Sequence, residues 1–347
     1  MPFERNEPPG GVRSHRRPGC SVAATDVIAY VTGAAGFVAS HLCDRLLLDG
    51  ASVVGVDNLA TGSLRNLAGA RTSSRFAFVQ ADVSERWESW TAALPAQLRR
   101  PDVVLQLASP ASPLQYERLA LQTMAVNALG TMHAVELAER SGAVLLFAST
   151  SESYGNPREH PQRETYWGNV NPVGMRSCYD ESKRFGEAYV TTAVRKLGID
   201  GRVVRIFNTY GPRMQAGDGR VIPSFCVAAL RGEPLTVYGD GSQTRSFCYV
   251  DDLVDGLVRF ATRDGLRGRV INLGNDGEYT IRELAEVTAR LAGAELRISS
   301  EALPPDDPTR RRPDVSLARA LLGWEPRTPL ETGLRHTLEY FRATAAG

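Results

Sequence analysis

The sequence has few cysteines, and none is spaced for a metal site or a disulfide framework. Five cysteines are spread over 347 residues, their number is odd, and no C-x-x-C pair occurs. Structural zinc sites and disulfide-stapled folds usually show the opposite pattern. We therefore expect no metal site, and we expect the protein to work in the reducing cytoplasm.

A long apolar run and an excess of one charge are also missing. No stretch approaches the roughly 20 apolar residues that a membrane-spanning helix needs. The formal net charge is +1, which gives no support for binding to nucleic acid or to a membrane surface. Residues 1–25 are rich in Pro, Gly and Arg and have no apolar centre like that of a signal peptide, so we expect a disordered leader there.

Apolar, strand-like runs alternate with segments of helical periodicity through the first two thirds of the chain. Ser52–Val56 is such a run, whereas Phe37–Leu48 and Ser182–Leu197 carry the helical pattern. This alternation predicts an α/β fold with a doubly wound, Rossmann-type parallel sheet. The last third is richer in Pro and Gly, which indicates a smaller, discontinuous C-terminal substrate-binding lobe. We expect the sheet domain over 26–212 and 246–275, and the lobe over 213–245 and 276–347.

A glycine-containing turn lies between the first expected strand and the first expected helix. Gly33 and Gly36 are followed by Phe37 and Val38, so backbone amides and a helix N-terminus face a bound phosphate. Asp57 ends the second strand, where its carboxylate binds a ribose diol and repels a 2′-phosphate, which favours NAD over NADP. Further residues at successive strand ends are expected around the same cofactor: Asn58, Thr61, Gly62, Asp82 and Val83.

Tyr179 and Lys183 are four residues apart on an expected helix and hence on one face. A phenol with a pKa near 10 is a poor base at neutral pH. A nearby ammonium and a positively charged nicotinamide ring would lower that pKa. The same spacing also occurs on solvated helix faces, but here Thr150 ends the preceding strand and would reach the same reaction centre. These three side chains predict reversible hydride transfer.

Longer stretches are more specific than the glycine turn. They resemble the extended short-chain dehydrogenase/reductase superfamily, which comprises nucleotide-sugar epimerases, dehydratases and decarboxylases, and within it most of all the UDP-glucuronate decarboxylases. The resemblance runs from about Val27 to Phe341, and its most specific stretches are Leu107–Pro113 (LASPASP), Ser149–Glu152 (STSE), Glu164–Pro172 (ETYWGNVNP), Ser177–Lys183 (SCYDESK), Leu235–Val250 (LTVYGDGSQTRSFCYV) and Asp306–Asp314 (DDPTRRRPD).

The resemblance implies oxidation of UDP-glucuronate at C4, loss of CO₂, and re-reduction by NADH to UDP-xylose. It also implies a homodimer packed through helices near Leu119–Arg140 and Ser182–Leu197. The site residues that it implies in addition to those above are Glu152 beside the sugar, Leu107, Ser109, Thr209 and Arg220 around the cofactor, and Tyr116, Asn208, Arg245 and Arg311 around the UDP-sugar. Arg245 is the expected diphosphate clamp, because a guanidinium binds phosphate in a bidentate manner.

Several alternatives stay open at this point. A UDP-sugar 4-epimerase shares the oxidation but does not lose CO₂, and a relative could stop at the 4-keto-pentose or use another nucleotide sugar. The segment Ala125-Val126-Asn127 stands where the family usually has Lys-Thr-Asn, which leaves the sugar open. A cofactor-binding protein without turnover is the alternative outside enzymes. The triplet Thr150-Ser151-Glu152 argues against a 4,6-dehydratase, which carries Thr-Asp-Glu there.

Overall fold

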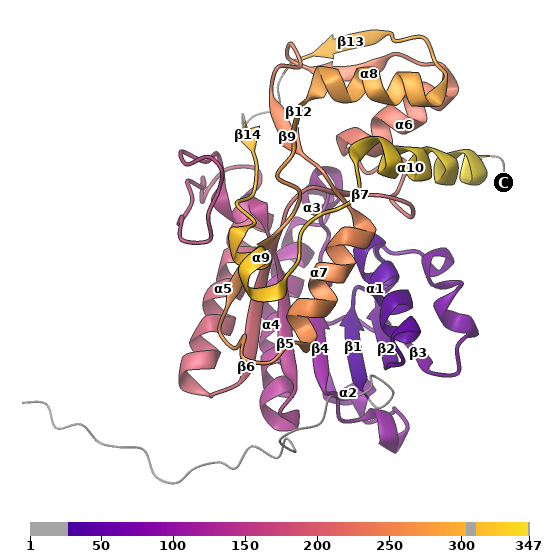
Figure 1. Cartoon of the computed structure of the whole chain (residues 1–347). Coiled ribbons are helices and arrows are strands. Elements are labelled where there is room, and N and C mark those ends of the chain that lie inside the picture. The colour runs from indigo at the N-terminus through magenta and orange to yellow at the C-terminus, as the bar shows by residue number, and fades with distance from the viewer. Residues whose placement is uncertain (1–26, 303–309, 346–347) are drawn as a thin grey trace, which may run out of the picture.

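The computed structural model describes residues 27–302 and 310–345, and the leader expected over 1–25 lies outside them. The chain forms a seven-stranded sheet with a smaller lobe at one end (Figure 1). Its strand order is β11-β6-β5-β4-β1-β2-β3 and all its pairs are parallel, which confirms the predicted sheet. The strands are β1 (Ile28–Thr32), β2 (Ser52–Asp57), β3 (Phe76–Gln80), β4 (Val103–Gln106), β5 (Val144–Thr150), β6 (Asp200–Ile206) and β11 (Val270–Leu273).

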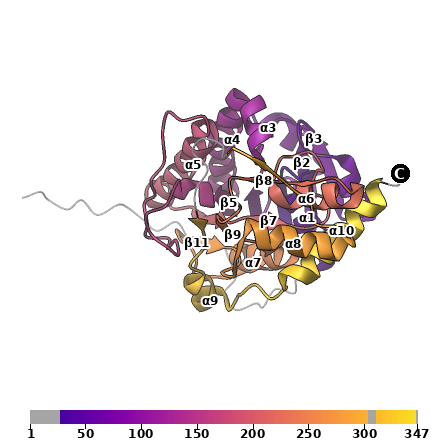
Figure 2. The same cartoon turned by 90° about the horizontal axis from the view of Figure 1, so that it is seen from above.

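Helices cover both faces of the sheet, as its apolar strands require. Helices α1 (Phe37–Leu48) and α7 (Val250–Thr262) pack on one face, and α4 (Ala120–Ser141) and α5 (Ser177–Lys196) on the other (Figure 2). Successive strand residues point to opposite faces. In β5, Val144 and Leu146 accordingly join one buried cluster, whereas Leu145 and Phe147 join the other.

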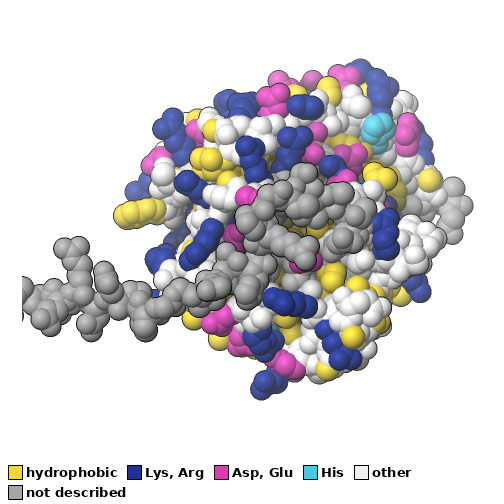
Figure 3. Space-filling model, turned by 60° about the horizontal axis from the view of Figure 1, so that its bottom comes forward, with side chains coloured by type: hydrophobic (Ala, Val, Ile, Leu, Met, Phe, Trp, Pro, Cys, Tyr) yellow, Lys and Arg dark blue, Asp and Glu magenta, His cyan; other side chains and the backbone are white. Residues whose placement is uncertain are grey.

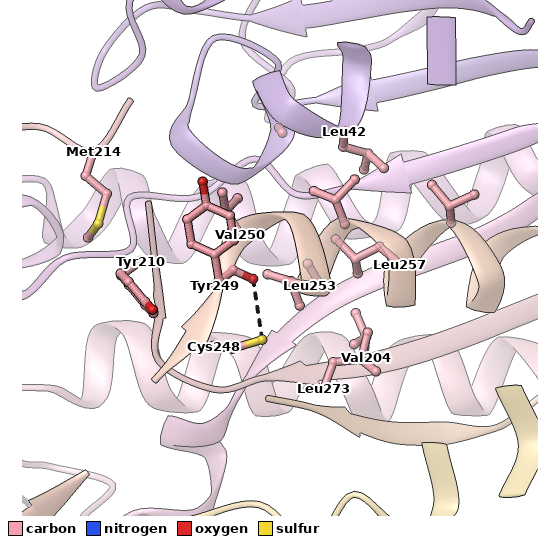
Figure 4. Packing of buried hydrophobic residues seen from close by; sticks show 14 of the residues in the cluster. Leu42, Val204, Tyr210, Met214, Cys248, Tyr249, Val250, Leu253, Leu257 and Leu273 are labelled. Carbon is pink, nitrogen blue, oxygen red and sulfur yellow. Dashed lines mark hydrogen bonds between the residues drawn. The ribbon is translucent and has the colours of Figure 1, made fainter. Parts of the chain in front are cut away.

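The core under α1 and α7 holds the loops that reach the site. Leu42 of α1 and Leu253 and Leu257 of α7 pack there against Val204 and Leu273 of the sheet (Figure 4). The short parallel pair β7 (Thr209–Tyr210) and β10 (Cys248–Tyr249) leads from β6 and into α7. This packing anchors both ends of the segment that follows β6, which contributes to the cavity described below.

Helix α5 begins at Ser177, five residues before the helix expected from the sequence, so Tyr179 and Lys183 both lie in its first two turns. The helix approaches the sheet closely at Gly186, where a methyl group would collide with the Phe147 ring. Helix α1, at Phe37–Leu48, has the expected bounds. The early start of α5 is what seats the phenol at the end of β5.

Among the described residues, the smaller lobe contains α6 (Val221–Arg231), α8 (Ile281–Ala292), α10 (Leu330–Ala345) and short strands, above the sheet (Figure 1). Helix α10 packs on α6 and α8, while α9 (Ser316–Leu322), inside the range 276–347, packs on β11 and α7 of the sheet domain. The domain boundaries stay a prediction. The other α-helices and strands of the described residues are α2 (Glu88–Thr91), α3 (Pro113–Arg118), β8 (Leu235–Tyr238), β9 (Thr244–Ser246), β12 (Glu278–Thr280), β13 (Ile298–Glu301) and β14 (Arg310–Arg311).

The surface carries both signs of charge. Basic and acidic side chains are interspersed over the face shown in Figure 3, in keeping with the net charge of +1. Within 27–302 and 310–345, no helix is both long and apolar enough to cross a bilayer.

Candidate active site

A cavity of about 1060 Å³ lies at the carboxyl ends of the sheet strands, with residues of the smaller lobe along its other side. The strand order reverses between β1 and β4, and ligands of open parallel sheets bind at such a switch point. All but one of the site residues predicted from the sequence line this cavity: Gly33, Gly36, Phe37, Val38, Asp57, Asn58, Thr61, Asp82, Val83, Leu107, Ser109, Tyr116, Thr150, Glu152, Tyr179, Lys183, Asn208, Thr209, Arg220, Arg245 and Arg311.

Gly62 is the exception and packs beneath the lining. A methyl group at Gly62 would stand 2.8 Å from the Ala35 Cβ and 2.9 Å from a carboxylate oxygen of Asp57. Its small size therefore lets the loop after β2 close over Asp57. Gly62 is not among the residues that line the cavity, and its part is to leave room for this packing.

The glycine turn presents backbone to the cavity. Gly33 has φ +69°, and a Cβ there would lie 2.9 Å from the Ala108 Cα, so only glycine fits without strain. The first residues of α1 line the cavity, and the N-cap residue, Gly36, has no side chain that could cap the helix. The first amides of α1 therefore face open space, which suits an anionic phosphate group.

Asp57 holds the glycine turn in place. Its two carboxylate oxygens accept hydrogen bonds from the backbone amides of Ala35 at 2.9 Å and Leu59 at 2.7 Å. Burial raises the pKa of Asp57, and these two amide bonds oppose that rise. Each carboxylate oxygen has a second lone pair for a ribose hydroxyl. Nearby, Asn58 donates to Asp82 at 2.9 Å, so these two predicted residues brace one another.

The side chains of Tyr116, Thr150 and Tyr179 meet at the end of β5. The Tyr116 ring stacks on the Tyr179 ring at 4.9 Å between centroids and 7° between planes. The Thr150 hydroxyl hydrogen bonds with the Tyr179 phenol. Within the described residues, the buried Tyr116 hydroxyl has no hydrogen-bond partner. A buried hydroxyl of this kind is costly to leave unpaired, so it is a position where a ligand group fits.

Lys183 lies on the same helix face as Tyr179, with its Nζ 5.8 Å from the centre of the phenol ring. The ammonium donates to the carbonyl of Ala148 at 2.9 Å, and burial lowers the pKa of Lys183 to about 7. Burial, and then the negative charge of Glu152, raise the pKa of Tyr179 above its ordinary value. The sequence predicted a lowered pKa for this phenol. In the protein chain by itself the pKa is raised instead, because burial outweighs the lowering effects of the Thr150 hydrogen bond and Arg220.

Glu152 is held between two guanidinium groups. Its Oε1 lies 2.8 Å from Arg176 Nη2 and 3.7 Å from Arg311 Nη1. These two positive charges lower the pKa of Glu152, although burial acts in the opposite direction. The carboxylate is therefore ionised at neutral pH, and it lies at the end of the cavity that also holds Tyr179 and Thr150.

Arg245 and Arg311 come from different parts of the chain but lie side by side. They are register partners in the parallel pair of β9 and β14, and both side chains are buried. Arg245 also donates to the carbonyl of Thr244 at 2.9 Å. Arg220 is held by Asp218 at 2.8 Å and lies 5.9 Å from the Phe37 ring. These three arginines thus make the wall that the smaller lobe contributes to the cavity positively charged.

Sequence reasoning missed two charged residues of this site. Arg176 pairs with Glu152, and Asp180 lies within hydrogen-bonding reach of the same carboxyl group. A signal was present, because a buried glutamate needs a positive partner. The sequence does not say which of the chain's arginines supplies it, since that depends on how the loop before α5 packs.

Within the described residues, no group of three or more His, Cys, Asp or Glu side chains is arranged to hold a metal ion.

Comparisons with known proteins show which sequences and structures this chain resembles. The sequence profile of the NAD dependent epimerase/dehydratase family matches residues 29–274. UDP-glucuronic acid decarboxylase 1 of Xenopus tropicalis is 47% identical over 312 residues, which cover 90% of this chain and 71% of that protein. UDP-glucuronic acid decarboxylase 3 of Arabidopsis thaliana is 47% identical over 313 residues, which cover 90% of this chain and 88% of that protein. Among solved structures, UDP-glucuronic acid 4-epimerase from Bacillus cereus, in complex with UDP-glucuronic acid and NAD, matches with a TM-score of 0.81 and 27% identity over 91% of this chain and 99% of that chain.

Proposed function

Because this chain belongs to the NAD dependent epimerase/dehydratase family, we propose that it converts UDP-glucuronate to UDP-xylose and CO₂ with NAD as its cofactor. The observation that carries the proposal is the meeting of Tyr179, Thr150 and the paired Glu152 in one cavity. The identity with UDP-glucuronic acid decarboxylases over most of the chain supports the substrate.

The residues present fit NAD. The glycine turn and the first amides of α1 suit its diphosphate, and the Asp57 carboxylate suits its adenosine ribose and disfavours a 2′-phosphate. Bound NAD⁺ supplies a hydride acceptor for C4 and a positive charge beside the phenol. The Asn58–Asp82 pair stands at the next strand end along the same edge. The cavity therefore has room and polarity for NAD together with a nucleotide sugar.

Tyr179 takes the proton of the C4 hydroxyl during oxidation and returns it during re-reduction. Thr150 orients the C4 hydroxyl of the sugar beside the phenol, because the Thr150 side chain hydrogen bonds with Tyr179. The C4 ketone makes the sugar a β-keto acid, which loses CO₂ as the electron pair of the C5–C6 bond delocalises into the ketone. Arg245 and Arg311 supply the positive charge for the diphosphate and the sugar carboxylate. Glu152, which lines the same cavity as Tyr179 and Thr150, passes a proton to C5 after CO₂ has left.

A direct assay tests the proposal. Purified protein is incubated with UDP-glucuronate and NAD while CO₂ release and the nucleotide-sugar product are followed. UDP-xylose and equimolar CO₂ are expected, and UDP-glucose, which has no carboxylate, serves as the control substrate. Conversion to UDP-galacturonate without CO₂ would show a 4-epimerase instead. Accumulation of a 4-keto-pentose with reduced cofactor would show an enzyme that stops halfway, and dTDP-glucuronate compares the nucleotide.

We further propose that two copies of the chain pair through the outer faces of α4 and α5. These helices pack against one another, and each exposes large apolar side chains: Leu121 is 77% and Met124 45% exposed on α4, and Phe185 is 43% exposed on α5. Burying such a patch against a second copy would stabilise a dimer.

The cytoplasm is the location that we propose for the protein. The proposal rests on the pattern of cysteines alone, and fractionation of the source cells tests it.

Light scattering coupled to size exclusion checks the dimer. The wild-type protein is expected at twice 37.7 kDa. Leu121→Asp should move it toward the mass of one chain, because a carboxylate would be buried without a partner at the centre of the contact. Leu48→Asp is the matched control, since Leu48 is 83% exposed on α1, away from α4 and α5. A wild-type protein that elutes as one chain at micromolar concentration would refute the dimer.

A further inference from the structure

If the chain decarboxylates UDP-glucuronate as proposed above, each turnover consumes a proton that the hydride-transfer steps do not supply. When the C5–C6 bond breaks, CO₂ leaves and the electron pair remains on the sugar as an enolate. A new C5–H bond must then form. The proton that Tyr179 takes from the C4 hydroxyl is returned at re-reduction, so it is not available for C5. One proton per turnover must therefore come from water, while the substrate fills the main cavity.

A second, smaller cavity shares Arg176 with the main cavity and has Asp180 in its lining. Its volume is about 460 Å³, and Asn156, Asn169 and Asn171 line it together with Arg176 and Asp180. The three asparagines are exposed, whereas Asp180 is only 7% exposed. Arg176 lines both cavities, but Asp180 lines only the smaller one. The side chain next to Tyr179 in the chain thus opens toward a separate polar pocket.

Asp180 and Glu152 form a carboxyl pair between the two cavities. They are within hydrogen-bonding reach of one another. In the described part of the chain, the buried atoms Glu152 Oε2 and Asp180 Oδ1 find no hydrogen-bond donor. Two carboxyl groups can bond to each other only when one of them carries a proton, because a carboxylate has acceptors and no donor. The geometry therefore requires a shared proton in this pair.

The surrounding charges place that proton on Asp180. Burial, and then the negative charge of Glu152, raise the pKa of Asp180, whereas Arg176 and Arg311 lower the pKa of Glu152. The other titratable groups near Asp180 are the hydroxyls of Tyr116 and Tyr179 and the Cys178 thiol, and burial raises the pKa of each. These groups stay neutral near pH 7, and the two arginines stay charged, so none of them is a ready proton source.

We propose that Asp180 relays a solvent proton from the smaller cavity through Glu152 to C5 of the sugar. The Asp180 carboxylic acid donates its proton to the Glu152 carboxylate, and Glu152 protonates the enolate carbon, so the C5–H bond forms as the enolate returns to a ketone. Asp180 is left as a carboxylate and takes a proton from water in the asparagine-lined cavity. The substrate then need not leave for the next proton to enter. In this scheme Asp180 is a positioning and relay residue, because it acts only through Glu152.

The test uses Asp180→Asn in the full-length protein with bound NAD. The asparagine amide can still donate to Glu152, so the pair keeps its hydrogen bond and the fold, but it has no proton to pass on. We expect kcat for UDP-xylose formation to fall about 10²-fold with KM little changed, while reduced cofactor still forms from UDP-glucuronate. Asp180→Glu should recover part of kcat. Glu181→Gln, which removes the neighbouring, half-buried carboxylate that pairs with Arg184 at 3.5 Å and lines neither cavity, should leave kcat unchanged.

The pH profile and the infrared spectrum separate a relay from a structural role. Asp180 is protonated below its raised pKa, so wild-type kcat should fall as the pH rises through that value, and Asp180→Asn should lack this decline. The infrared carbonyl band of a neutral carboxylic acid should be present at neutral pH in the wild type and in Glu181→Gln, and absent in Asp180→Asn. Wild-type kcat and pH profile in Asp180→Asn would overturn the relay. A wild-type enzyme that releases no CO₂ from UDP-glucuronate would instead overturn the proposed function.

Discussion

Replacing Tyr179 by phenylalanine is expected to lower kcat by about 10²–10⁴-fold, the usual contribution of a positioned acid–base group. The change removes only the phenol oxygen. The ring can still stack on Tyr116, and the lost hydrogen bond to Thr150 is worth about 1 kcal/mol, so the variant should fold. Turnover of UDP-glucuronate measures the effect, and NAD titration by calorimetry measures whether the cofactor site is intact.

Tyr189→Phe is the matched control, because Tyr189 lies on the same helix, stacks on Phe185 and does not line the cavity. It should retain wild-type kcat. A Tyr179→Phe enzyme with a near-normal rate would remove the phenol from the chemistry. Loss of NAD binding together with turnover would instead assign Tyr179 to the cofactor site and leave the acid–base role without support.

Replacing Glu152 by glutamine should lower CO₂-coupled formation of UDP-xylose by about 10²–10⁴-fold, since the residue that passes the proton to C5 is then an amide. Formation of reduced cofactor should persist, because the phenol and Thr150 are untouched. Arg176 and Arg311 lose their counter-charge, and removing one member of a buried ion pair typically costs about 3–5 kcal/mol of unfolding free energy. Single-turnover absorbance and chemical denaturation measure the two effects.

The stability effect of Glu152 has a definite pH dependence. The arginines hold the pKa of Glu152 below its ordinary value, so its stabilisation is present above the pKa of an unfolded glutamate. It is lost as the pH falls through the lowered value, and Glu152→Gln should show less of this acid-side loss. Glu88→Gln, at a surface pair with Arg140, is the control and should change stability little. Full decarboxylation by Glu152→Gln would show that C5 takes its proton elsewhere.

Local patterns predicted the parallel sheet and its first helix. The strand runs are apolar because both faces of the sheet are covered, and the Phe37–Leu48 helix follows from its periodicity and the glycines before it. The Tyr179–Lys183 spacing needs only one helix to bring both groups to a common face. These predictions succeed because the forces that decide them act between residues close in sequence.

What the sequence by itself determined is the parallel sheet, the glycine turn before α1 and the helical pairing of Tyr179 with Lys183. Only the tertiary structure decided that Arg311 lies beside Glu152, since this depends on the register of β14 against β9. The tertiary structure also decided that the Asp180 side chain lines a second cavity and that burial raises the pKa of the Tyr179 phenol. Charge pairing and burial depend on which distant segments pack together, and a residue's sequence neighbours do not record that.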